Sequence, residues 1–172
     1  MLVLKIVLRL LHILGGIFWV GSGLLSFFFL SPAAQATKET GQKFMGYIAQ
    51  NTSLIKMIYI AAYTTVGAGA VLYWIDTNGF KNNWFLSGPG IGFGLGAIAA
   101  LIGLYFGVKV GSNTTALGKL GMEIQSQGTP PTEDQLKSMQ SMQAQLKTGG
   151  LVNIICLILA AILMATARYW VF

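Results

Sequence analysis

The sequence has very little charge. Asp, Glu, Lys and Arg make up 9% of its 172 residues, against about 25% in an ordinary soluble domain. Hydrophobic residues make up 54% of the chain. A chain with so few charges and so many apolar residues is typical of a membrane protein, and we expect the lipid bilayer to be its main partner.

Residues for common chemistry are also scarce. The chain has one cysteine, Cys156, so an internal disulfide is excluded. Its one histidine, His12, is the only base for a nucleophile, and no apolar segment holds a pair of carboxylates. Hydrolysis is therefore disfavoured. The net charge of +6 comes from basic residues scattered at the ends of apolar segments, which does not indicate nucleic-acid binding.

Four segments are long and apolar enough to cross a membrane, a task that needs about 20 residues each. They are residues 10–30, 57–75, 89–110 and 151–168. The first is too long for the apolar part of a cleaved signal peptide. The sequence predicts an all-α fold, a four-helix transmembrane bundle that forms a single domain over residues 1–172.

The third connection, about residues 112–148, predicts a helical hairpin that extends spans three and four. Leu117, Leu120 and Ile124 repeat at helical spacing on one arm. The sequence 128–131, Gly-Thr-Pro-Pro, breaks the helix, and Thr132 with Gln135 forms a capping-box pattern that restarts it. Each arm would project about 20–25 Å.

Four spans place both termini and the middle loop on one side of the membrane. That side has fewer basic residues than the side of loops one and three, which holds Lys38, Lys43, Lys56, Lys109, Lys119, Lys137 and Lys147. The positive-inside rule favours loops one and three in the cytoplasm and the termini in the periplasm. We expect a multi-pass protein of the bacterial inner membrane.

His12 is the strongest candidate for a functional residue, because an ionisable side chain within a span is costly. His12, Gly16 and Trp19 fall on one helical face, and a face with small residues suits a flat macrocycle. Imidazole is a good axial ligand for haem iron. The sequence suggests a b-type haem bound through His12, with Arg9 and Arg168 near its propionates. Copper ligation by His12 and a structural imidazole bonded to a neighbouring helix are the alternatives.

The Leu-His pair of the first span, followed by Trp19 and Gly21, resembles two related bacterial families. These are the copper-resistance D-like proteins and the membrane-bound protoporphyrinogen oxidases of the HemJ type. The hairpin and the ending 164–169, Met-Ala-Thr-Ala-Arg-Tyr, resemble an uncharacterised family of four-span membrane proteins. The oxidase resemblance implies that His12 is a haem-linked histidine. The lysine that this family carries within a later span has no counterpart here.

Together these patterns favour a small, non-catalytic membrane subunit of a bacterial redox or bioenergetic assembly that holds one b-type haem through His12. Other membrane subunits would be its protein partners. The alternatives are a free-standing haem-linked oxidoreductase and a copper-handling membrane protein. A solute transporter is a weaker alternative, since the spans contain almost no charged groups that could gate a transport pathway.

Overall fold

The computed structural model describes residues 1–171 and is all-helical in this range. The main helices are α1 (Leu2–Leu25), α2 (Ser31–Ala36), α3 (Lys38–Asn51), α4 (Leu54–Asp76), α5 (Gly88–Gln127) and α6 (Glu133–Thr166). Short helical turns complete the chain: η1 (Ser26–Leu30), η2 (Asn83–Leu86) and η3 (Ala167–Tyr169). Four helical stretches are long and apolar enough to span a membrane, which confirms the predicted bundle.

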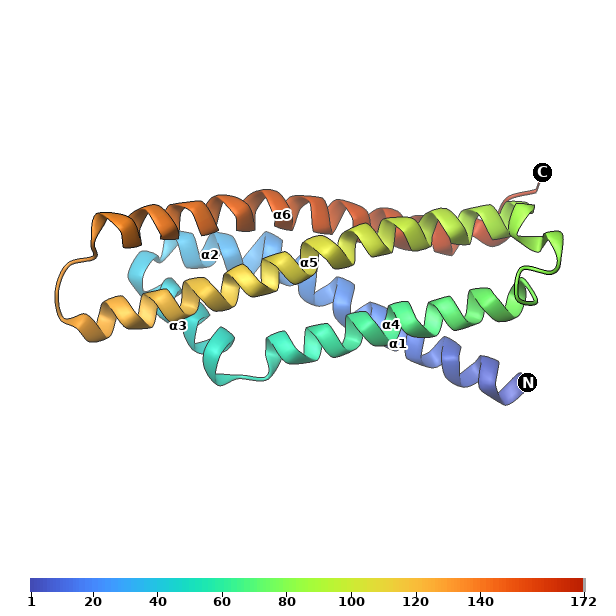
Figure 1. The fold of residues 1–172 in the computed structure, drawn as a ribbon, viewed down its shortest axis with the longest axis horizontal. Helices are drawn as coiled ribbons and strands as arrows, with labels where there is room; N and C mark the ends of the chain where they lie inside the picture. The colour runs from blue at the N-terminus through green and yellow to red at the C-terminus, as the bar shows by residue number, and fades with distance from the viewer. Residues whose placement is uncertain (172) are drawn as a thin grey trace.

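The four long helices form two pairs. α5 packs along α6, and α1 packs along α4, whereas contacts between the two pairs are sparse. The molecule is elongated, with both termini and the α4–α5 connection at one end and the α5–α6 turn at the other (Figure 1). We call these the terminal end and the hairpin tip. The shared end for the termini and middle loop agrees with the expected topology.

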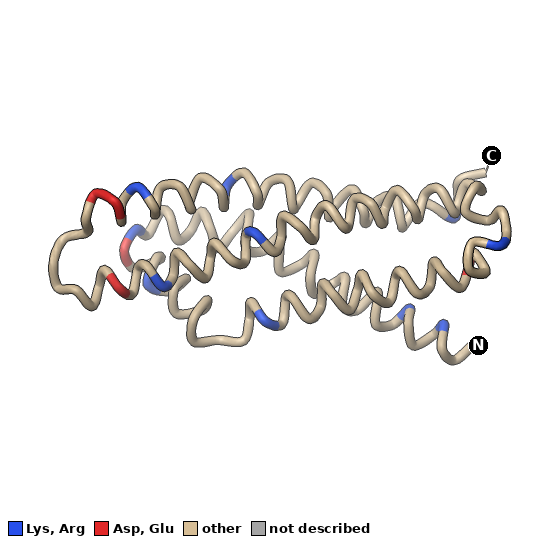
Figure 2. The backbone as a smooth tube through the Cα atoms, in the orientation of Figure 1, with Lys and Arg blue, Asp and Glu red and all other residues tan. Residues whose placement is uncertain are grey.

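Charged residues mark the part of the molecule that fits the bilayer. Figure 2 shows basic residues at the terminal end and again about half-way along, with an almost uncharged stretch between them. On α4 this stretch runs from Lys56 to Asp76, a rise of about 30 Å. The uncharged stretches that end at Lys109 on α5 and Lys147 on α6 have nearly the same length. Since about 30 Å is the thickness of the hydrocarbon layer, these three lysines define one membrane boundary, which we call the lysine level.

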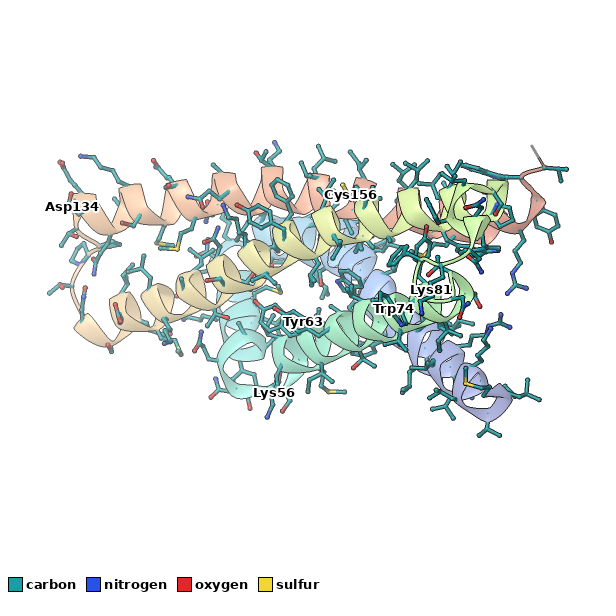
Figure 3. The ribbon with its side chains drawn as sticks, turned by 45° about the vertical axis from the view of Figure 1, so that its right-hand side comes forward. Lys56, Tyr63, Trp74, Lys81, Asp134 and Cys156 are labelled. Carbon is teal, nitrogen blue, oxygen red and sulfur yellow. The ribbon has the colours of Figure 1, made fainter. Side chains whose placement is uncertain are left out.

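Beyond the lysine level, α5 and α6 continue as the predicted hairpin. The arm of α5 from Val110 to Gln127 extends by about 26 Å. Gly128 ends it in the left-handed conformation, at φ 65°. Thr132 then caps α6: its hydroxyl accepts from the backbone N–H of Gln135, and the Gln135 side chain accepts from the N–H of Thr132. Asp134 lies at the hairpin tip and Lys56 half-way along (Figure 3).

The connection between the first two spans forms α2 and α3, which lie beside the hairpin and outside the predicted spans. α3 approaches α5 closely through glycine, because a Cβ on Gly46 would lie 3.8 Å from the Cα of Gly118. Gln50 also donates to the backbone carbonyl of Thr115 at 2.7 Å. The extramembrane half is therefore a small helical layer of α2, α3 and the two hairpin arms.

Polar contacts fasten the terminal end. Lys5 Nζ lies 2.8 Å from the Asp76 carboxylate, which joins the first turns of α1 to the end of α4. Tyr73 donates to the carbonyl of Gly90 at 3.1 Å, and its ring lies 5.6 Å from that of Trp84. Tyr73 thus ties α4 to α5 at the membrane boundary, where aromatic residues are common.

Candidate functional site

A large cavity lies between the two helix pairs and continues into the extramembrane layer. Its volume is about 1240 Å³, above the usual range of about 300–1,000 Å³ for a small-molecule site. We call it the chamber. Its walls come from the second half of α1, from η1, α2 and α3, from the start of α4, and from the facing stretches of α5 and α6. The two pairs make few contacts with each other, and the chamber occupies space between them.

Apolar side chains dominate the chamber walls. They come from every surrounding helix and include Phe27, Met45, Ile58, Leu104, Leu117, Met139 and Ile154. Along α6 the lining runs from Leu136 near the tip to Asn153 within the membrane, a rise of about 25 Å. Cavities with apolar walls tend to exclude water and to take up apolar molecules. The chamber therefore suits an elongated apolar occupant.

Two polar side chains form the inner end of the chamber, which we call the floor. Trp19 on α1 is 4% exposed and Asn153 on α6 is 7% exposed. Both line the chamber. They lie close together, because a Cβ placed on Gly107 of α5 would be 2.9 Å from Asn153 Nδ2 and 4.0 Å from Trp19 Nε1. The floor is thus built by three helices, about 9 Å inside the lysine level when measured along α6 from Lys147.

Glycines make this arrangement sterically possible. A Cβ on Gly23 would lie 3.1 Å from Ile154 and 3.7 Å from Asn153 Oδ1. Small residues allow such close approach of membrane helices. The Asn153 side chain lies between α1 and α5, and its Nδ2 donates to the carbonyl of Gly103 at 2.6 Å. Asn153 is therefore held in one orientation, with its oxygen toward α1.

One donor and one acceptor remain available at the floor. Among residues 1–171, neither the Trp19 Nε1–H nor the Asn153 Oδ1 makes a hydrogen bond within the chain. In the described part of the chain, however, every side-chain nitrogen or oxygen atom that is completely buried has a hydrogen-bond partner. Both atoms therefore keep some accessible surface, although their residues are more than nine-tenths buried. They can bind a group that both accepts and donates a hydrogen bond.

The charged residues of the chamber lining lie outside the floor. The charged lining residues are Glu39, Lys43 and Lys147, and all three are exposed. Glu39 Oε1 lies 2.7 Å from Lys43 Nζ, and this ammonium group lowers the pKa of Glu39 below its usual value. The Glu39–Lys43 pair thus forms a charged outer rim on α3, Lys147 lies nearer the floor at the lysine level, and the floor itself is polar and neutral.

His12 lies away from the chamber, at the contact of α1 with α4. Its Nδ1 is 2.7 Å from the backbone oxygen of Thr65, and since a carbonyl only accepts, Nδ1 donates. The ring also packs against Gly69, because a Cβ there would lie 2.8 Å from the His12 ring. This is the bond to a neighbouring helix that the sequence offered as the alternative to haem ligation.

The structure separates the five residues that the sequence grouped around a haem. Gly16 faces the Thr65 side chain, 3.6 Å from the position of an added Cβ, so α4 covers the face expected to receive a macrocycle. Trp19 belongs to the chamber floor. Arg9 and Arg168 are exposed near the terminal end. Within residues 1–171, the residues around His12 therefore supply one candidate axial ligand, and α4 occupies the face expected to receive the ring.

His12, Gly16, Trp19 and Gly23 do form a stripe on one face of α1. This stripe does not pack against a single neighbouring helix. Its first half contacts α4, and its second half contacts α6. This happens because α1 crosses the bundle rather than running parallel to it (Figure 1). The sequence signals for the floor are Trp19 on this stripe and Asn153, a polar residue within the fourth apolar segment.

Within residues 1–171, no three His, Cys, Asp or Glu side chains gather as they would around a metal ion. Comparisons of the chain with protein-family models, with curated proteins and with solved structures find no match. The feature of this four-span membrane protein that bears on its function is therefore the chamber that crosses the lysine level.

Proposed function

We propose that this protein is a non-catalytic membrane protein that holds the hydrocarbon part of a lipid in the chamber. The observation that carries the proposal is the apolar cavity of about 1240 Å³ that begins within the bilayer and continues outside it. An apolar molecule can enter such a space from the membrane and be partly lifted from it. Burial of apolar surface supplies the driving force.

The dimensions support a lipid chain as the occupant. The chamber extends about 25 Å along α6, whereas one leaflet of the hydrocarbon layer is about 15 Å thick. One extended chain therefore fits along its length. Most of the length, from Lys147 to Leu136, lies beyond the lysine level, where an apolar surface has no bilayer to cover it.

Photolabelling in nanodiscs tests this proposal. A phosphatidylcholine with a diazirine near the end of one acyl chain is incorporated, irradiated, and its attachment sites are mapped by mass spectrometry. Because its charged head group suits the outer part of the chamber, we expect labels on chamber residues beside the floor, such as Gly23 and Ile154. Labels found solely on lipid-facing residues, such as Ile98 and Ile155, would contradict the proposal.

Two glycines offer a matched pair of variants. Gly121 lines the chamber, and a Cβ there would meet no atom within 4 Å, so Gly121→Trp narrows the chamber with little strain. Gly67 also has open space within 4 Å but does not line the chamber. We expect chamber labelling to fall several-fold in Gly121→Trp and to stay unchanged in Gly67→Trp.

A haem-linked subunit of a redox assembly is the second candidate function, favoured by the hydrogen bond of His12. Histidine ligands commonly donate their other ring nitrogen to a backbone carbonyl, as His12 Nδ1 does to Thr65. Nε2 would then be the ligand, and another subunit would have to cover the ring. A Soret band that is lost in His12→Ala would support this function, whereas a fully folded, partner-bound protein without the band would eliminate it.

Topology and location are part of the same proposal. The excess of lysine on the side of the hairpin supports a cytoplasmic hairpin and hence a periplasmic terminal end in a bacterial inner membrane. A chamber in this orientation would present its outer rim to the cytoplasm.

A further inference from the structure

We infer that the floor selects a long-chain alcohol or phenol, which binds with its hydroxyl group between Trp19 and Asn153 and its chain directed toward the hairpin tip. This inference rests on the proposed function, because it assigns the chemistry of the molecule in the same chamber. It follows from the hydrogen-bonding groups at the floor and from the distribution of charge along the walls.

A hydroxyl group complements the floor. The Trp19 Nε1–H can donate to the hydroxyl oxygen, and Asn153 Oδ1 can accept the hydroxyl hydrogen. Both protein groups are more than nine-tenths buried and unpaired within residues 1–171. A group that satisfies both removes the cost of leaving buried polar atoms without partners, whereas a plain alkyl end satisfies neither.

Charged head groups do not suit the floor. A buried ion needs an opposite charge, and none of the charged groups of the lining, Glu39, Lys43 and Lys147, belongs to the floor. A carboxylate would instead lie near Lys43 in the extramembrane part, with its chain pointing inward. The alcohol and the carboxylate of the same chain length should therefore bind in opposite directions.

This reversal can be measured with two probes. Sixteen-carbon molecules with a diazirine at the end of the chain, one an alcohol and one a carboxylate, are added separately to nanodiscs that hold the full chain. We expect the alcohol to label Leu136 and Met139 near the tip. We expect the carboxylate to label Gly23 and Ile154 beside the floor.

Removal of the floor donor supplies the second readout. Trp19→Phe keeps an aromatic ring and loses the N–H, so labelling of the tip by the alcohol should fall about fivefold, or about 1 kcal/mol. The matched variant Trp74→Phe, at the exposed terminal end, should behave as the wild type. If Trp19→Phe does not fold, the opposite labelling by the two probes in the wild type still decides the question.

The outcomes separate this inference from the proposed function. If the alcohol labels the floor, or labels both ends equally, the hydroxyl assignment is wrong while the chamber remains a lipid site. If neither probe labels any chamber residue and only lipid-facing residues react, the proposed function is wrong and this inference falls with it.

Discussion

Two glycine-to-alanine changes on α5 should have different effects on stability. Gly92 faces the end of α6: an added Cβ would lie 2.8 Å from the Cβ of Ala167 and 3.0 Å from its Cα. Carbon atoms prefer about 3.5–4.0 Å, and Ala167 is fully buried, so α5 and η3 would have to separate. Overpacking of this kind costs about 1–3 kcal/mol.

Gly121 on the same helix meets no atom within 4 Å of an added Cβ. Gly121→Ala should therefore gain only the conformational advantage of alanine in a helix, about 0.5–1 kcal/mol. Because Gly92→Ala has the same advantage, the difference between the two variants isolates the clash, which we expect to be about 1–3 kcal/mol.

Reversible unfolding by SDS in mixed micelles, followed by circular dichroism, measures both variants. We expect Gly121→Ala to unfold at higher SDS than the wild type and Gly92→Ala to unfold at lower SDS than Gly121→Ala. Equal stability of the two variants would refute the close packing of α5 against the end of α6.

Three further predictions test other parts of the structure. Asp76→Asn should break the ion pair at the start of α1 and increase hydrogen exchange of its first turns, while exchange in α5 stays constant. Because Lys43 lowers the pKa of Glu39, their pair should stabilise α3 above about pH 4.3, the usual value for glutamate, and lose that effect as the pH falls through the lowered pKa. Exchange in α3 of Glu39→Gln should then lack this acid dependence. Asp134→Cys in a Cys156→Ser background should resist an impermeant maleimide added outside intact bacteria, and rapid labelling would reverse the proposed topology.

Local rules predicted most of the fold. The four spans followed from run length and scarce charge, and the hairpin restart at Thr132 followed from a pattern that acts over three residues. Both depend on neighbours in sequence, so no knowledge of packing was needed. The structure adds the continuation of α1 through η1 into α2 and the separation of the helices into two pairs.

The candidate site could not be predicted in the same way, because it depends on how α1 crosses the other helices. Sequence periodicity correctly put His12 and Trp19 on one face of α1, but it could not show that α4 covers His12 while the chamber reaches Trp19. Asn153 stood out only as a polar residue in a span. Its role at the floor depends on Gly23 and Gly107, which are distant in sequence.

The most direct test of the lipid chamber is a high-resolution experimental structure of the protein in a lipid bilayer. Our account predicts continuous density for a hydrocarbon chain between the α1–α4 and α5–α6 pairs, running from the hairpin tip to Trp19 and Asn153. Closure of the space by movement of α3 against α6, or a chamber filled by ordered water alone, would contradict it.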